Sequence, residues 1–394
     1  MEFQKLTHRR LIGAVVAAAA MAAAGLAGSA AASADGATTP DLQTLTYAST
    51  GPGGGLYHPV GVSAAGGKVY VSNSGANIIA TIAGGTTSAF AGSLSAFGEH
   101  GDGGQATSAS LYHPGGSAVD AAGDVFIADS GDNVIREVTP AGTIKRTAGT
   151  GIAGLGYAGP AGFPATLSSL DHPQDVAVSA AGDVYIADTY NNRVLKVTPS
   201  GQVTAVAGDG TAGYSGDGRL APFAELNEPT GVAVDAKGNL YIADSANNVI
   251  RRVDARTGII TTVAGDYAAD KASGGLGGFS GNGGPATSAQ LNTPQGIAVD
   301  GAGDLFIADT FNNAIREVTP AGVITTVVNS SAQPGGESNG AAATASKLNT
   351  PYGVSIDAST GDLYIADTNN SKIAEVAGLA QSGDAAGPVA PAHS

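Results

Sequence analysis

Short apolar segments separated by turns rich in Gly, Asn and Asp recur along most of the chain. In one of them, residues 231–235 are small and apolar, and Leu240 and Ile242 alternate with other residues up to Asp244. After turns at 245–248 and 256–258, the segments VIRRV and IITTVAG follow. Runs of this length and alternation, bounded by turn residues, predict four consecutive antiparallel β-strands.

The same four-strand pattern occurs six times. The copies begin at Leu56, Leu111, Leu170, Leu226, Leu291 and Leu348, at intervals of 55 to 65 residues. This period predicts an all-β, six-bladed β-propeller over residues 42–377. The last copy lacks a fourth strand, and residues 44–51 resemble the fourth strands of the other copies. We expect this N-terminal strand to complete the last blade and close the ring, because closure removes two unpaired sheet edges.

The copies share the consensus L-x-x-P-x-G-[VI]-A-V-D-x-x-G-[DN]-[LV]-[YF]-I-A-D-x-x-N-N-x-[IV]-R-x-V. This consensus resembles the NHL-repeat propellers, and the intervening G-[YF]-S-G-[DN]-G segments resemble the long-period NHL units of secreted bacterial proteins and teneurin-type domains. The resemblance implies the fold. It does not select a function, because NHL-like propellers include RNA-binding, protein-binding and lyase members.

The two ends of the chain differ from the repeats. Residues 1–34 have a basic start, an Ala-rich apolar run and the sequence Ala32-Ser33-Ala34, an order typical of a secretory signal peptide cleaved after Ala34. We therefore expect a secreted, extracellular protein without a membrane span after processing. An uncleaved membrane anchor is the alternative, and the choice between Sec and twin-arginine export stays open. Residues 35–41 are interpreted as a linker and residues 378–394 as a disordered tail.

Composition narrows the choice of chemistry. The chain has 60 Gly, no Cys and no Trp, which excludes a disulfide scaffold and a cysteine-ligated zinc site. The formal net charge is −15, and it becomes −17 when residues 1–34 are removed. Nucleic-acid binding needs a cationic surface, so we expect no nucleic-acid partner.

Propeller connectivity divides the loops between two faces. One face collects the long inter-blade insertions, the D-x-x-N-N hairpin tips and the L-x-x-P loops, and we call it the long-loop face. Long loops on a rigid scaffold commonly carry binding sites. The aromatic residues expected there are binding candidates, although they could instead pack against neighbouring blades; they are Tyr57, Tyr112, Tyr190, Phe311 and Tyr352.

Repeated acidic positions have a structural interpretation. The I-A-D aspartates could ring a cation, but their recurrence in almost every blade favours hydrogen bonding to their own hairpin backbones. Asp102, Asp217 and Asn282 in the Gly-rich insertions could bind calcium, but each loop shows few oxygen ligands, so turn formation is the better interpretation.

The residue before the repeated proline breaks the sixfold pattern. It is His58, His113 and His172 in the first three blades, then Glu228, then Thr. Equivalent positions in adjacent blades form an arc at the channel mouth, and three imidazoles with a carboxylate suit zinc or another divalent metal. The alternative is that these side chains simply face solvent.

From these observations we expect a monomeric, exported, non-enzymatic binding module without a cofactor. Its long-loop face would bind an extracellular protein, peptide or glycan. The alternative is a metal-dependent lyase or lactonase that holds one divalent metal, zinc or calcium, on the histidine arc.

Overall fold

The computed structural model describes residues 42–45, 55–83, 86–93, 98, 100–154, 162–336 and 340–379. The predicted signal peptide, its cleavage site and the linker at 35–41 lie outside the described residues. The sequence assigns Gly378 and Leu379 to the tail, but the Gly378 N–H donates to Asp362 Oδ1 at 2.8 Å and Leu379 is buried. The last blade therefore extends to Leu379, and the rest of the predicted tail lies outside the described residues. No helix in the described part of the chain is long and apolar enough to span a membrane.

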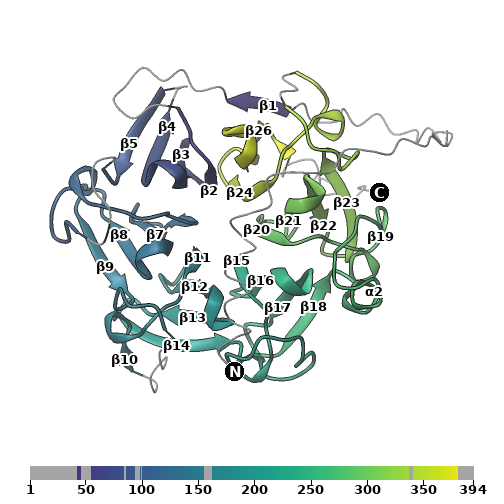
Figure 1. Cartoon of the computed structure of the whole chain (residues 1–394), viewed down its shortest axis with the longest axis horizontal. Coiled ribbons are helices and arrows are strands. Elements are labelled where there is room, and N and C mark those ends of the chain that lie inside the picture. Colours follow the sequence, from purple (N-terminus) through teal and green to yellow (C-terminus); the bar gives the residue numbers. More distant parts are fainter. Residues whose placement is uncertain are drawn as a thin grey trace, which may run out of the picture. The chain divides into compact units, whose positions relative to one another are not determined.

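Six antiparallel sheets lie around a central axis (Figure 1) and confirm the predicted six-bladed propeller. In order they contain β2 (Pro59–Ala65), β3 (Lys68–Asn73), β4 (Ile78–Ala83) and β5 (Thr86–Ala91); β6 (Ser117–Val119), β7 (Val125–Asp129), β8 (Val134–Val138) and β9 (Ile144–Ala148); β11 (Pro173–Val178), β12 (Val184–Asp188), β13 (Arg193–Val197) and β14 (Gln202–Ala207); β15 (Pro229–Val234), β16 (Leu240–Asp244), β17 (Val249–Val253) and β18 (Ile260–Ala264); β20 (Pro294–Val299), β21 (Leu305–Asp309), β22 (Ala314–Val318) and β23 (Val323–Val328); β24 (Pro351–Asp357), β25 (Asp362–Asp367), β26 (Lys372–Val376) and β1 (Leu42–Leu45). We number these sheets as blades 1 to 6. The first strand of each blade lies nearest the axis.

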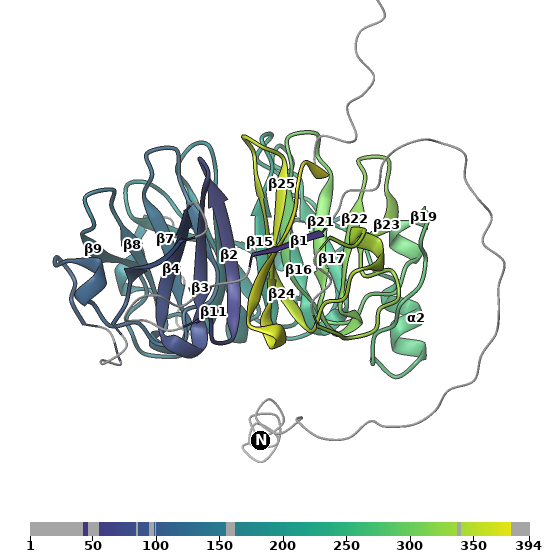
Figure 2. The same cartoon turned by 90° about the horizontal axis from the view of Figure 1, so that it is seen from above.

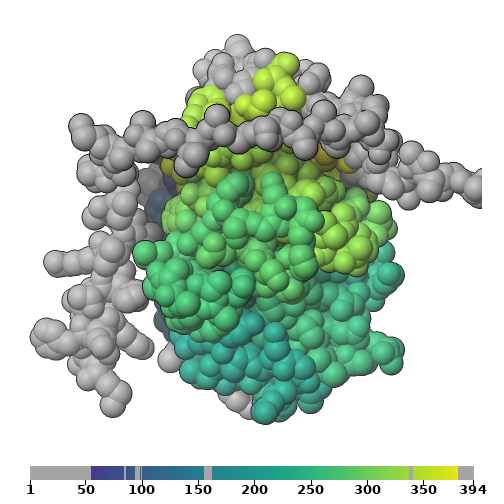
Figure 3. Space-filling view, turned by 90° about the vertical axis from the view of Figure 1, so that its right-hand side faces the viewer, coloured from purple at the N-terminus to yellow at the C-terminus, as the bar shows by residue number. Residues whose placement is uncertain are grey.

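Short elements fill the connections. A 3-10 turn follows the second strand of each blade, namely η1 (Ser74–Ala76), η3 (Ser130–Asp132), η5 (Thr189–Asn191), η7 (Ser245–Asn247), η9 (Thr310–Asn312) and η11 (Thr368–Asn370). Others end the insertions, namely η2 (Ala106–Ser108), η4 (Ala165–Leu167), η6 (Ala221–Phe223), η8 (Ala286–Ser288) and η10 (Ala343–Ala345). The two-residue strands β10 (Phe163–Pro164) and β19 (Gly284–Pro285) lengthen blades 3 and 5, and α2 (Tyr267–Ala272) lies in the insertion after blade 4. Figure 2 shows the blades edge-on, and the green surface in Figure 3 includes blades 4 and 5.

The N-terminal strand closes the ring as predicted. β1 pairs antiparallel with β26, so that Leu42 lies opposite Val376 and Leu45 opposite Ile373. The strand begins at Leu42, two residues before the predicted 44–51, and residues 46–51 of that prediction lie outside the described residues. The polar and apolar pattern of residues 42–51 allows both segments, and β26 is only five residues long and pairs with the earlier one.

The core consists of apolar layers between neighbouring blades. Phe126 and Ile135 of blade 2, for example, pack with Ile186 and Leu195 of blade 3. A corresponding layer joins blade 6 to blade 1, so the ring closes through packing as well as through strand pairing. Burial of apolar area between blades is therefore the main force that holds each blade to the next.

Deletion of residues 35–45 should lower the melting temperature by ~5 °C or more and increase aggregation, because β26 then becomes an exposed edge strand. Differential scanning calorimetry with light scattering measures both effects. The matched control deletes residues 380–394, which the sequence predicts to lie outside the propeller. Equal melting temperatures for the full chain and the 35–45 deletion would contradict closure by β1.

Candidate functional site

A repeated pair of hydrogen bonds, which we call the hairpin clasp, joins the tip of one blade to the L-x-x-P loop of the next. In its first bond, a Ser or Thr hydroxyl at the start of the 3-10 turn donates to the proline carbonyl of the next blade. The donors Ser130, Thr189, Ser245 and Thr310 contact Pro173, Pro229, Pro294 and Pro351 at 2.5 to 2.8 Å. Thr368 donates to Pro59 at 2.7 Å and thereby joins the last blade to the first.

The second bond of the hairpin clasp fixes the residue before the proline. An Asn that ends the 3-10 turn accepts the backbone N–H of that residue in the next blade. The pairs are Asn77 with His113, Asn133 with His172, Asn192 with Glu228, Asn248 with Thr293 and Asn313 with Thr350, at 2.6 to 3.0 Å. All six residues before the repeated prolines have φ between 48° and 55°, a left-handed conformation that is strained for residues other than Gly.

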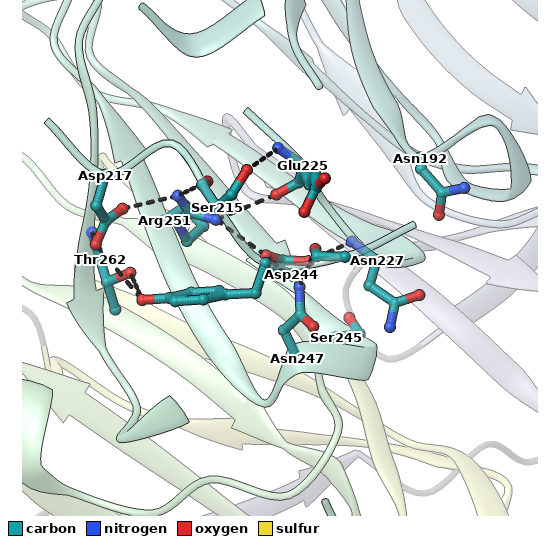
Figure 4. A network of polar contacts seen from close by, with 12 residues as sticks. Asn192, Ser215, Asp217, Glu225, Asn227, Asp244, Ser245, Asn247, Arg251 and Thr262 are labelled. Carbon is teal, nitrogen blue, oxygen red and sulfur yellow. Dashed lines mark hydrogen bonds and ion pairs between the residues drawn. The ribbon is translucent and has the colours of Figure 1, made fainter. Parts of the chain in front are cut away.

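The I-A-D aspartates accept hydrogen bonds inside the blades. Asp244 is fully buried; its Oδ1 accepts the Asn227 N–H at 2.7 Å, and its Oδ2 accepts from Asn247 at 2.9 Å and from Arg251 at 3.3 Å (Figure 4). Burial raises the pKa of Asp244 to about 6, against the opposing effect of these hydrogen bonds. The predicted structural role is thus supported, but the backbone donor lies in the L-x-x-P loop, 17 residues earlier, and not in the aspartate's own hairpin.

The Gly-rich insertions contact buried arginines of the third strands. Arg251 is fully buried, and its Nη2 donates to Asp217 Oδ1 at 2.7 Å and to the Ser215 carbonyl at 2.9 Å (Figure 4). The guanidinium carbon of Arg251 lies 4.8 Å from the centre of the Tyr214 ring. Equivalent pairs join Arg136 to Asp102 and Arg316 to Asn282. Asp102 and Asp217 therefore hold an arginine, as counter-ions within the fold.

The insertions are also attached to the hairpin tips. An Asn side chain of the tip donates to an insertion carbonyl, as Asn191 does to Gly154, Asn247 to Gly213, Asn312 to Gly278 and Asn370 to Gly335, at 2.6 to 3.0 Å. These contacts place the tips beside the first part of each insertion on the long-loop face. The last part can reach the opposite face, since the Ala221 N–H donates to the Gly258 carbonyl at 2.9 Å. Hydrogen bonds from side chains therefore connect the tips and insertions to one another.

The three histidines lie beside aromatic rings. His172 stacks on Tyr190 with ring centroids 5.0 Å apart, Tyr112 lies 4.5 Å from His113, and His58 lies 6.2 Å from Tyr352. Burial and then the charge of His113 lower the pKa of His58; burial also lowers the pKa of His172, where Asp171 opposes the effect and His113 adds to it. Among the described residues, no group of three or more His, Asp or Glu side chains is placed to hold a metal ion.

Four blades share one aromatic position on the long-loop face. In blades 1 and 2 the ring belongs to Tyr57 or Tyr112 in the L-x-x-P loop, and it occupies the space that a Cβ at Gly75 or Gly131 of the tip would fill.

In blades 3 and 5 the tip itself carries the ring, as Tyr190 or Phe311, and the loop carries Asp171 or Asn292. In each of the four blades the tip N–H donates to the loop carbonyl at 2.8 to 3.2 Å. One exposed ring therefore occupies each site, whereas Tyr352, the fifth predicted residue, is partly buried.

The first strands enclose a central channel. Its mouth is a cavity of about 50 Å³ on the long-loop face, and a further segment of about 210 Å³ continues below it. Five blades place glycine second after the repeated proline, because a Cβ there would meet the backbone of the adjacent first strand; a Cβ at Gly353 would lie 2.7 Å from the Val60 carbonyl oxygen. Blade 3 has Asp175 at this position, and its carboxylate lies beside Gly116 of blade 2.

Asp175 is the only acidic residue among the described residues that line the channel. Its Oδ2 accepts the Val232 N–H of blade 4 at 3.0 Å, and it forms no ion pair within the described residues. Burial raises the pKa of Asp175 to about 7, and hydrogen bonds from the backbone of Val232 and Val176 oppose the rise. A carboxyl group that changes its charge near neutral pH is typical of a binding or catalytic position.

Comparison with known proteins identifies the repeats. The Teneurin NHL domain family matches residues 95–208, 210–274 and 277–336, more than half of the chain. The chain belongs to the NHL-repeat family. Mouse teneurin-4 is 34% identical over 232 residues, which cover 55% of this chain and 8% of teneurin-4. This NHL propeller therefore corresponds to a small part of that relative.

Solved structures share the fold. A gluconolactonase from Xanthomonas campestris has a TM-score of 0.54 and 14% identity, with 87% of this chain and 95% of that chain covered. An auxiliary nutrient binding protein from Bacteroides thetaiotaomicron has a TM-score of 0.57 and 14% identity, with 85% and 75% covered. At this identity the likeness concerns the fold of the NHL propeller alone.

Sequence reasoning overlooked two features of this NHL propeller. The buried arginines could have been found from the sequence. Arg occurs at this third-strand position only in blades 2, 4 and 5, and the G-x-x-G-[DN]-G insertions precede the same three blades. The other blades have Ala80, Leu195 and Ala374 there. Asp175 also carries a sequence signal, because it is the one departure from P-x-G among the six copies.

Arg251→Met should lower the free energy of unfolding by about 3 kcal/mol, because it leaves Asp244 and Asp217 without their buried counter-ion. Urea denaturation followed by far-UV circular dichroism measures the loss. The control Asp217→Asn reproduces the arrangement of blade 5 and should cost less than about 1 kcal/mol. A loss of similar size for both variants would refute the role assigned to the arginine.

Asp175→Asn should stabilise the propeller at pH 8 by about 2 kcal/mol, because the amide removes a partly buried charge. The folded-state pKa lies above the ordinary value, so the native state binds the extra proton and the wild type loses stability as the pH rises from about 4 to about 7. The gap between variant and wild type should widen over this range and stay constant above about pH 8. Urea denaturation at several pH values measures it, and a gap that does not change with pH contradicts this prediction.

Proposed function

We propose that this NHL propeller is an exported, non-enzymatic binding module that presents its long-loop face to a protein or peptide outside the cell. The observation that carries the proposal is the shared aromatic position, at which four blades expose one ring each. Five aromatic side chains are exposed within the described residues, and four of them, all but Phe223, occupy this position.

The setting of these rings supports a role as contact anchors. The tips of blades 3 and 5 are held by both the hairpin clasp and the insertion contacts. The tip of blade 2 is held by the hairpin clasp. Aromatic side chains are enriched at protein interfaces, and a surface that is already ordered loses little entropy on binding. The acidic composition favours a partner with basic groups.

The enzyme alternative has less support. A lyase or lactonase with a metal on the histidine arc needs imidazoles that converge, whereas His113 and His172 lie against tyrosine rings. No group of three or more His, Asp or Glu side chains among the described residues is placed to hold a metal ion. The similarity to a gluconolactonase concerns the fold and does not assign any catalytic residue in this chain.

Export is part of the proposal and rests on residues 1–34. Their basic start, apolar run and Ala-Ser-Ala end are the features of a cleaved secretory signal. The absence of Cys and the acidic mature charge are compatible with an extracellular location.

Panning of a random peptide library on the full chain tests the proposed function. The wild type should enrich a consensus, and the combined change Tyr57→Ser, Tyr112→Ser, Tyr190→Ser and Phe311→Ser should weaken binding of the selected peptide at least ~30-fold, because each buried aromatic anchor contributes about 1 kcal/mol or more. Leu220→Ser with Phe223→Ser is the matched control, since it removes exposed apolar side chains next to the turns of the opposite face.

Two results would overturn the proposal. One is the absence of any enriched peptide together with stoichiometric zinc or calcium retained after dialysis, which would favour the lyase or lactonase. The other is equal loss of affinity in the two sets of variants, which would mean that the shared aromatic position is not the contact surface. Binding to a glycan array without any peptide enrichment would show that the ligand is a carbohydrate and would overturn the choice of a protein or peptide.

A further inference from the structure

The channel mouth holds one carboxylate without a counter-ion. Of the described residues that line the two channel segments, only Asp175 carries a formal charge at neutral pH, and no Lys or Arg lines either segment. The I-A-D aspartates Asp129, Asp188, Asp244 and Asp309, by contrast, contact arginines at 2.8 to 3.5 Å. Four of the five I-A-D aspartates are thus paired with arginine inside their blades, whereas the carboxylate that lines the channel has no cationic group beside it among the described residues.

The position of Asp175 has a structural cost. The other five blades have glycine there, and the Asp175 carboxylate fits only because Gly116 of blade 2 has no side chain. A charge buried without a partner destabilises the fold, and a local departure from a repeat that lowers stability points to a functional position.

We propose that the channel mouth binds a primary ammonium group, such as the end of a lysine side chain or a free alkylamine, with Asp175 as its counter-ion. The ammonium enters from the long-loop face, because the mouth is formed by the residues that directly follow the repeated prolines.

The size of the mouth selects this ligand class. A cavity of about 50 Å³ has room for a few water molecules, and so for an ammonium group with one or two methylenes. A sugar ring or an aromatic ring is too large. The other residues that line the mouth, among them Gln174, Thr230, Gln295 and Tyr352, carry no formal charge.

The same lining argues for an organic cation over a divalent metal. Calcium takes six to eight oxygen ligands and zinc about four ligands from His, Cys or carboxylate groups. The mouth offers a single carboxylate, and one of its oxygens already accepts the Val232 N–H. One carboxylate does match the single charge of an ammonium ion.

This inference deepens the proposed function only where the ammonium belongs to a partner's lysine. A free alkylamine would bind the mouth even if the shared aromatic position contacts nothing. The two proposals can therefore fail separately.

Titration of the ¹⁵N-labelled full chain with n-butylamine at pH 8 tests the inference by NMR. The amide resonance of Val232 is the readout, because its N–H donates to Asp175. We expect a saturable shift of this resonance, and at least 10-fold weaker binding in Asp175→Asn. Asp175→Gly, the residue of the five other blades, gives a second test if the Asn variant does not fold. Asp124→Asn, in a turn of the opposite face, removes the same formal charge and should bind n-butylamine like the wild type.

The neutral analogue 1-butanol should not shift the Val232 resonance. Equal affinity for 1-butanol and n-butylamine, or unchanged n-butylamine affinity in both Asp175 variants, would overturn the inference. A lysine-containing peptide and its Nε-acetylated form distinguish the sources. Tighter binding of the lysine peptide than of n-butylamine, lost on acetylation, assigns the ammonium to a partner protein, and binding of n-butylamine alone assigns it to a small amine.

Discussion

The hydrogen bond from a Ser or Thr hydroxyl at one hairpin tip to the proline carbonyl of the next blade is the contact on which the long-loop face depends. Together with the Asn side chain that accepts the following blade's N–H, it holds the residue before the proline in a left-handed conformation, as in Glu228. Because Thr368 makes the same bond to Pro59, the contact runs through the ring closure as well. The hydroxyl bond therefore joins blades 2 to 6 in succession and blade 6 to blade 1, and Asn77 joins blade 1 to blade 2 through the His113 N–H.

Buried charge is used differently in different parts of the propeller. In blades 2, 4 and 5 an aspartate and an arginine neutralise each other and hold a Gly-rich insertion, which turns three long loops into ordered parts of the face. Such pairs fix geometry more than they add stability, because their desolvation offsets most of their attraction. Asp175 has no such partner and lines the channel among neutral residues, and for this reason we propose it as the binding position.

The repeat made most of the fold predictable, since a four-strand pattern copied six times leaves few alternatives to a propeller. It also located the long-loop face and the four exposed rings. The start of β1 was not predictable, because the pattern of residues 42–51 does not show which of them pair with the short strand β26. The histidines were interpreted as an arc of possible ligands, but side-chain direction depends on the left-handed backbone at His113 and His172, which the sequence does not display. Asp175 was visible as a departure from P-x-G, yet its significance depends on the narrow axis where the first strands meet.

A direct measurement of the ionisation of Asp175 tests whether the channel mouth holds an unneutralised carboxylate. The side-chain carboxyl ¹³C resonance of Asp175 can be followed from pH 4 to pH 9 in the intact chain, with Asp175→Asn used for assignment. The account predicts a midpoint near pH 7, moved to a lower pH when n-butylamine saturates the mouth. A midpoint at the ordinary aspartate value of about 4, unchanged by the amine, would contradict it.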